Sequence, residues 1–247
     1  MHLDLSQRQM SYKKKIVCLA NSRKYPSGFC VAGMEVGSGT DAGSWIRPVS
    51  ARETEEISEE ERRYEDGTEP ELLDIISITL SKSSPDAHQQ ENHLIDDNYY
   101  WEKKGTVSWE ELQKAVENPK GPLWYNGPSS THGTNDEVPE NRVAEMTRSL
   151  YLVRPDKLTI LVKLESRGSY GPPRRRVRAT FDLCGHSYCF AVTDPHIERK
   201  YLAGPNGEFK LKDALLCVSL AKPFNGYAYK LVAAVITPER AGAGKKK

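Results

Sequence analysis

The chain has 247 residues, a mass of 27.8 kDa and a net charge of +1. Because it is nearly neutral, it is not a protein that coats nucleic acid by charge alone. No apolar run approaches the ~20 residues that cross a bilayer, and the N-terminus lacks the apolar core of a signal peptide. We therefore expect a cytoplasmic protein without a membrane partner.

The charges are distributed unevenly along the chain. Residues 142–247 carry 20 Lys and Arg against 9 Asp and Glu, whereas residues 1–141 carry 15 against 25. The carboxyl-terminal half is basic and the amino-terminal half is acidic. The five cysteines are an odd number without the spacing of a disulfide framework or a zinc site. We expect them to be core thiols, with no metal and no cofactor.

Strand-like segments and turn signals alternate through the first hundred residues. The segments are rich in β-branched and aromatic residues with partial period-two alternation. A short helix at 58–64, with Ser58 as its N-cap, interrupts them. Strands are expected at 14–20, 29–36, 44–50 and 72–80, and the fifth, which is the least defined, is placed around 91–95.

A polar loop follows the first strand. Asn21 and Ser22 offer amide and hydroxyl groups beside the cations Arg23 and Lys24. This combination predicts a phosphate-binding loop. The alternative is a solvated turn in which Asn21 and Ser22 bond their own backbone.

The stretch GSWIRPVS, residues 43–50, places an arginine in a strand. Trp45 and Arg47 point to one face, because side chains alternate along a strand. If that face is open, Arg47 would meet a phosphate and Trp45 would stack on a base, which is our preferred interpretation. The alternative is a structural arginine, held by a cation–π contact or by a salt bridge to the acidic helix that follows.

The middle of the chain, residues 101–148, has a different pattern. Ser108 and Glu111 have capping-box spacing before a helix that Pro119 ends. The residues that follow have turn chemistry throughout, which predicts a long ordered loop. Asn135 and Asp136 in this loop, together with Asn92 and His93, form a possible polar site. Loop capping and domain docking are the alternative roles.

The second half has the order of three strands, one short helix and two strands. Asp194 as a cap, Pro195 at the first helical position and Gly204 beyond the end predict a helix at 194–204. Strands are expected at 149–166, 175–183, 187–194, 214–220 and 227–237. This is the order of the OB-fold, a five-stranded Greek-key barrel, and the first half can be aligned with it.

Arginines gather at the start of the second strand of this basic barrel. In an OB-fold the loop between strands one and two borders the ligand face, and guanidinium groups suit phosphates. The arginines are Arg174, Arg175, Arg176 and Arg178, and the tyrosines that could stack on bases are Tyr170, Tyr188, Tyr227 and Tyr229. The alternative is a solvated edge beside ordinary core tyrosines.

Several segments of the chain form a recognisable set. They are KIVCLANSRK (15–24), FCVAG (29–33), WIRPVS (45–50), LLDII (72–76), ENHLID (91–96) and the closing LCVSL and GYAYKLVAAVI (216–236). Through them the chain resembles the bacterial dual OB-containing domain family over residues 15–237. The resemblance implies an all-β protein with short helices and two OB-like barrels in tandem. The expected division is 1–12 disordered, 13–100 first barrel, 101–148 connecting segment, 149–237 second barrel and 238–247 disordered.

Three functions remain open. The chain has no nucleophile motif, P-loop or dinucleotide fingerprint, which lowers the odds of an enzyme without excluding one. The leading hypothesis is a module that binds single-stranded DNA or RNA on the barrel faces. A second is an interaction adaptor whose acidic stretch Glu53–Glu71 docks a basic protein. A third is an enzyme or sensor for a nucleotide-like molecule, which would use the Asn21–Lys24 loop with Arg47, Asn92 and His93.

Overall fold

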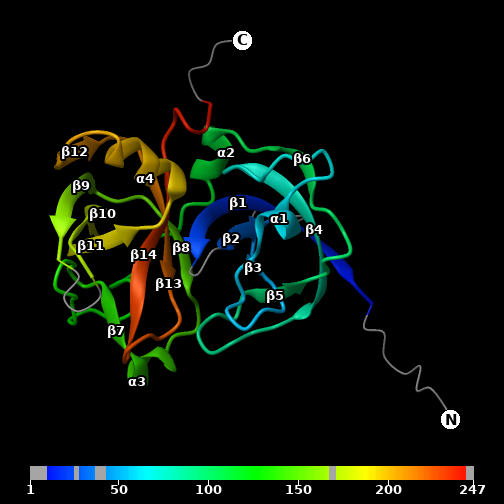
Figure 1. Cartoon of the computed structure of the whole chain (residues 1–247), viewed down its shortest axis with the longest axis horizontal. Coiled ribbons are helices and arrows are strands. Elements are labelled where there is room, and N and C mark those ends of the chain that lie inside the picture. The colour runs from blue at the N-terminus through cyan, green and yellow to red at the C-terminus, as the bar shows by residue number, and fades with distance from the viewer. Residues whose placement is uncertain (1–9, 25–27, 37–42, 167–170, 243–247) are drawn as a thin grey trace.

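Two β-barrels lie side by side in the molecule (Figure 1). The structure is a computed structural model, and it describes residues 10–24, 28–36, 43–166 and 171–242. The first barrel comes from the amino-terminal half of the chain and the second from the carboxyl-terminal half. The charge asymmetry of the sequence is therefore an asymmetry between the barrels.

Hydrogen bonds close the first barrel. Its strands are β1 (Tyr12–Lys24), β2 (Gly28–Glu35), β3 (Trp45–Val49), β4 (Asp74–Ser83) and β5 (Asn92–Ile95). They follow the order β1, β2, β3, β5, β4, and β4 returns to pair with β1. β3 and β5 are parallel, and the other neighbours are antiparallel. This connectivity is that of the OB-fold, and the fifth strand expected around 91–95 is confirmed.

The helix between β3 and β4 is short and well capped. α1 (Glu59–Arg62) starts at Ser58, whose hydroxyl accepts the backbone N–H of Glu61, while the Glu61 carboxylate accepts the backbone N–H of Ser58. This reciprocal pair satisfies donors that are otherwise free at the start of a helix. α2 (Trp109–Gln113) starts with the same arrangement, as its sequence predicts.

The second barrel repeats the connectivity of the first. Its elements are β8 (Leu150–Val153), β9 (Lys157–Glu165), β10 (Arg174–Leu183), β11 (His186–Val192), α4 (Pro195–Leu202), β12 (Gly207–Leu211), β13 (Leu215–Leu220) and β14 (Tyr227–Ile236). The order is β12, β9, β10, β11, β14, β13, β8. β11 and β14 are parallel, as β3 and β5 are in the first barrel. α4 starts at the cap that Asp194 and Pro195 predict.

One strand prediction for this barrel is wrong, and a second, at 214–220, is confirmed as β13 but lacks its first part. The strand expected at 149–166 is divided into β8 and β9 around Pro155, which has no backbone N–H to donate to a ladder. β8 pairs with β13, whereas β9 pairs with β10 and β12. The fourth strand is also divided, and its first part, β12, was missed. Together β12 and β13 close the ring, because one pairs with β9 and the other with β14.

The connecting segment packs against both barrels. β6 (Glu102–Thr106) extends the first sheet beside β4, and Trp109 and Leu112 of α2 are buried between the barrels. The long loop that follows lies against the second barrel. It leads into β7 (Glu137–Pro139), which pairs with β14, and then into α3 (Glu140–Val143). The segment is therefore part of the fold of both halves.

An apolar layer joins the two barrels. In Figure 1, β8, β13 and β14 of the second barrel face β1, β2 and β3 of the first. The layer consists of Leu19, Ala20, Ala32 and Met34 from the first barrel, Leu150, Leu152, Leu215, Cys217, Ala233, Ala234 and Ile236 from the second, and Leu73, Trp109 and Leu112. All of these side chains are buried. Removing this much apolar surface from water holds the barrels together as one unit.

The ends of the described chain are attached to the fold. Ser11 donates a hydrogen bond to Asp96 just before β1 begins. At the other end Arg240 donates to Asp194 Oδ2 at 2.5 Å, so residues 238–242 lie folded beside α4 rather than disordered as expected. Residues 1–9 and 243–247 lie outside the described residues. No helix in the described ranges is long and apolar enough to span a membrane.

The shared core predicts that the two barrels unfold together. Leu152 is completely buried in the apolar layer, so Leu152→Ala should lower the free energy of unfolding by about 2–5 kcal/mol through lost contacts and a cavity. Differential scanning calorimetry should show one transition, shifted to lower temperature. Leu164→Ala is the control, because Leu164 is 59% exposed and should tolerate truncation. Two separate transitions in the wild type would contradict the shared core.

Candidate functional site

The usual ligand face of an OB-fold is covered in the first barrel. Ligands of this fold bind on strands two and three, which are β2 and β3 here. The outward side chains Ala32 and Met34 of β2 lie in the apolar layer, and Trp45 of β3 packs against it. The Trp45 indole N–H also donates to Glu117 Oε2 at 3.1 Å. The structure thus gives Trp45 a packing role in place of the predicted base stacking.

Arg47 is buried between the barrels. Its Nη2 donates to Ser149 Oγ at 2.8 Å and lies 3.1 Å from Glu91 Oε1, and Ser149 Oγ donates to the same carboxylate. Arg47 is 4% exposed, which leaves no surface for a phosphate. The preferred interpretation of this arginine is therefore wrong. The structural alternative holds, with Glu91 as the partner in place of the acidic helix.

Removing Arg47 should destabilise the protein. Arg47→Ala leaves the buried Glu91 charge without a counter-ion, so the free energy of unfolding should fall by about 3–5 kcal/mol in chemical denaturation. The double variant Arg47→Met, Glu91→Gln should recover much of this loss, because no buried charge then lacks a partner. Wild-type stability in Arg47→Ala would contradict the assigned role.

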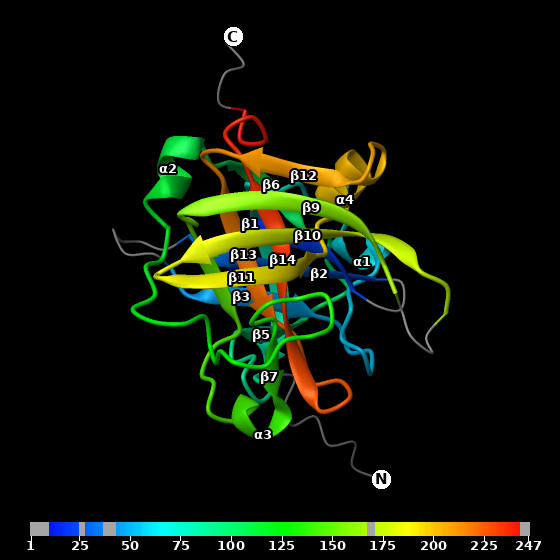
Figure 2. The same cartoon turned by 90° about the vertical axis from the view of Figure 1, so that its left-hand side faces the viewer.

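Two predicted contacts on the second barrel are also internal. Figure 2 shows β9, β10 and β11 side by side on this barrel. Tyr188 is 1% exposed, and its hydroxyl accepts the backbone N–H of Leu123 at 2.9 Å. Arg178 donates to both oxygens of Glu165, at 2.7 and 3.2 Å, and lies 3.5 Å from Asp136. Both side chains are unavailable to a ligand, because the loop before β7 contacts each of them and Glu165 of β9 pairs with Arg178.

The loop before β7 is fastened from several sides. Lys230 of β14 is buried, and its Nζ donates to Tyr125 O at 2.6 Å and to Asn126 Oδ1 at 3.0 Å. Burial lowers the pKa of this ammonium group to about 7. Asn135 donates to a carbonyl of β11, and Asp136 is buried beside β10. Both residues therefore have the docking role that the sequence left open.

The other predicted polar residues are not gathered into one site. They bond within the protein: His93 with Tyr12, Asn92 with Gln89, Ser22 with Cys30 and Tyr229 with Glu137. Tyr227 is 37% exposed on the hairpin between β13 and β14, and Tyr170 lies outside the described residues. Of these side chains, the ones that the structure describes do not line the cavity described next.

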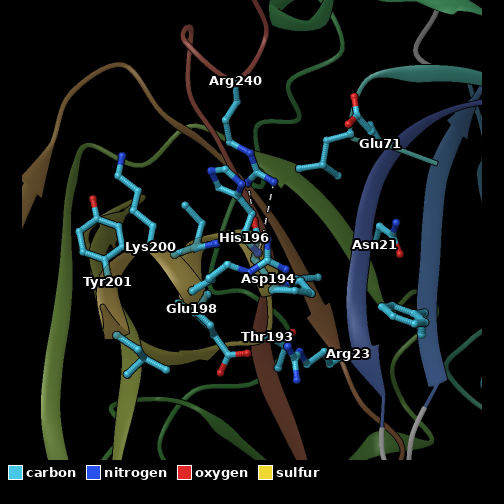
Figure 3. A pocket seen from close by; sticks show the side chains of 18 of the residues that line it. Asn21, Arg23, Glu71, Thr193, Asp194, His196, Glu198, Lys200, Tyr201 and Arg240 are labelled. Carbon is cyan, nitrogen blue, oxygen red and sulfur yellow. Dashed lines mark hydrogen bonds and ion pairs between the residues drawn. The ribbon is translucent and has the colours of Figure 1, made fainter. Parts of the chain in front are cut away.

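A cleft of about 1670 Å³ lies between the barrels, beside α4 (Figure 3). One wall comes from β1, β2 and the residues before β4, and the other from α4 and the start of β10. The backbone N–H of Arg23 donates to the carbonyl of Thr193 at 3.1 Å, which links the end of β1 to the second barrel. The structure thus brings two predicted groups, in 21–24 and 174–176, into one cavity.

Arginines on both walls of the cleft lack an ion-pair partner among the described residues. Arg23 comes from β1, and Arg174 and Arg176 come from β10. Among the residues that the structure describes, no carboxylate lies within 4.0 Å of their guanidinium nitrogens. Burial lowers the pKa of Arg176, and the charge of Arg174 acts in the same direction. Unpaired guanidinium groups that line one cavity favour an anionic ligand.

Arg175 has a different role from its neighbours. Its guanidinium group donates to Asn206 Oδ1 at 2.8 Å, to Leu202 O at 2.9 Å and to Gly204 O at 2.5 Å. These bonds occupy carbonyls that are left free where α4 ends. The run of four predicted arginines therefore divides into two that face the cleft, one that caps a helix and one, Arg178, that is buried.

Side-chain contacts stabilise the wall of the cleft that the first barrel forms. The Arg62 guanidinium stacks on the Phe29 ring, 3.7 Å from its centroid, and donates to Glu69 at 2.6 Å. Asn21 donates through Nδ2 to Pro70 O at 2.8 Å. Asn21 and Arg62 thus hold the segment before β4 against the barrel. The role of these two residues in the cleft wall is therefore to stabilise the fold.

Figure 3 shows the opposite side of the cleft, which α4 supplies. The Asp194 carboxylate accepts a hydrogen bond from the backbone N–H of His196 and forms an ion pair with Arg240. Burial lowers the pKa of the His196 imidazole, and the charge of Arg240 acts in the same direction. Both effects favour the neutral form of this imidazole. Glu71 lies across the cleft from Arg240 (Figure 3).

Sequence reasoning missed the contribution of α4 to the cleft. The residues are His196, Glu198, Arg199, Lys200 and Tyr201. The helix itself was predicted from its cap, but a charged helix does not reveal which neighbour it faces. The sequences ERRY at 61–64 and ERKY at 198–201 are similar, and residues of both helices line the cleft. This similarity was an available signal that the two helices have related positions.

Comparison with known families matches residues 14–235 to the dual OB-containing domain. The match includes both barrels and the connecting segment, and it agrees with the strand connectivity of each barrel. No curated protein matches the chain.

Proposed function

Because the chain belongs to the dual OB-containing domain family, whose fold is a binding scaffold, we propose that it binds single-stranded nucleic acid in the cleft between its barrels. One observation carries this proposal. Arg23 of the first barrel and Arg174 and Arg176 of the second converge on the cleft without ion-pair partners. A phosphate backbone supplies anions at the regular spacing that such separated cations can contact.

The size of the cleft favours an extended ligand. Pockets for small molecules typically enclose roughly 300–1000 Å³. This cleft encloses about 1670 Å³, which leaves room for several linked nucleotides. A single nucleotide would leave much of the cavity to water.

Phosphate contacts should contribute more to affinity than base stacking. Arg62 covers one face of Phe29, and Tyr201 is only 8% exposed. Aromatic faces on which bases stack are therefore scarce among the described residues of the cleft. The expected behaviour is strong salt dependence with weak preference for sequence, because contacts to the backbone carry no sequence information.

The other two hypotheses have less support. In the acidic stretch Glu53–Glu71, Glu55, Glu61 and Glu69 are paired with basic side chains of the protein itself, which reduces the charge available to a partner. The nucleotide-like site required Arg47 and His93 beside the Asn21–Lys24 loop, and these two residues do not line the cleft. The proposal of a bound single strand requires only residues that do line the cleft.

The proposal predicts the effect of removing two unpaired arginines. Arg23→Ala with Arg176→Ala should weaken binding of a fluorescein-labelled 15-nucleotide strand for every sequence alike. The slope of log affinity against log salt should flatten by about one to two units, because each lost phosphate contact contributes ~0.7. Fluorescence anisotropy at several salt concentrations measures both quantities, for DNA and RNA and for a duplex competitor.

A matched control removes the same charge elsewhere. Lys157 and Lys210 are exposed on β9 and β12 and do not line the cleft. Lys157→Ala with Lys210→Ala should leave the salt slope near the wild-type value. Equal losses in the two double variants would indicate a diffuse charge effect. A wild type that binds no single strand at low salt would overturn the proposed function.

A further inference from the structure

Glu198 has an unusual position among the arginines of the cleft. It lies in the first turn of α4, and in Figure 3 its carboxylate points toward the side of the cleft where Arg23 and Thr193 lie. An acidic side chain at this place opposes the binding of a phosphate. Its presence needs an explanation if the cleft holds a polyanion.

Charges from two other elements act on this carboxylate. Arg176 and Arg174 of β10 and Arg23 of β1 favour its ionised form, and Asp194 at the start of α4 disfavours it. Yet within the described part of the chain no cation forms an ion pair with Glu198 inside 4.0 Å. Because Glu198 and the three arginines line the same cleft, the carboxylate neutralises part of the arginine charge without fixing any one of the three.

Burial makes ionisation of this group costly. The carboxyl is more than half buried, and burial raises its pKa, an effect that the three arginines oppose only in part. A phosphate that entered beside the same arginines would add a second negative charge to the same partly desolvated space. Two like charges there would repel each other, and the carboxyl would relieve the repulsion by taking up a proton from water.

We propose that Glu198 is the internal counter-anion of the arginines in the cleft, and that a phosphate bound beside Arg23, Arg174 and Arg176 is coupled to uptake of one proton by Glu198. This inference rests on the proposed function and adds to it a residue that makes the affinity depend on pH. At high pH the ionised carboxylate lowers the affinity for a strand, and protonation at low pH removes that opposition.

His196, Arg199 and Lys200 share the helix with Glu198 and line the same cleft. Protonation of His196 at low pH would add positive charge to the cleft and would mimic the effect. A test must therefore separate Glu198 from His196.

The experiment measures the affinity for a labelled 15-nucleotide strand between pH 5 and pH 8 at fixed ionic strength. Wild-type affinity should rise as the pH falls. Glu198→Gln should bind about five- to tenfold more tightly than the wild type at pH 8 and should lose most of the pH dependence. His196→Gln should keep it. Glu208→Gln, the same change at an exposed position on β12, should behave as the wild type.

Calorimetry gives a second readout, which does not depend on the pH at which affinities are compared. Wild-type binding enthalpies in buffers of different ionisation enthalpy should show uptake of a proton near neutral pH, which Glu198→Gln abolishes. If Glu198→Gln binds as the wild type does or more weakly, the inference is overturned while the proposed function stands. If neither protein binds any strand at low salt, the proposed function fails instead.

Discussion

The packing of β1 and β2 against β13 and β14 is the constraint on which the rest of the structure depends. It buries the strands on which an OB-fold usually binds its ligand, and so removes the first barrel as an independent binding module. The same packing places the end of β1 beside Thr193 and opens a cleft next to α4. The cleft is therefore formed only where the two barrels pack together, since both contribute to its walls.

The arginines of the protein divide according to their carboxylate partners. Arg47 and Arg178 are buried with Glu91 and Glu165, and each stabilises a contact between segments far apart in the chain. Arg23, Arg174 and Arg176 of the cleft have no such partners among the described residues, although Glu198 lines the same cleft. Charge that is not neutralised within the fold, on both walls of one cavity, is the basis of the binding proposal.

Local signals predicted much of the fold but little of the site. The caps at Ser58, Ser108 and Asp194 were read from the sequence because a cap and its helix are adjacent in the chain. The partner of Arg47 is not adjacent, since Ser149 lies 102 residues away. Arg176 and Arg178 share one face of β10 by alternation, yet only Arg178 meets buried carboxylates, and this difference depends on the packing of a distant loop. Such pairings follow from tertiary structure, which no local pattern encodes.

Chemical labelling of arginines, read by mass spectrometry with and without a bound single strand, locates the binding surface. A strand held in the cleft should protect Arg23, Arg174 and Arg176 together, on both barrels. Arg63, which is 41% exposed outside the cleft, should remain reactive. Protection confined to one barrel, or to arginines outside the cleft, would contradict a ligand held between the two barrels.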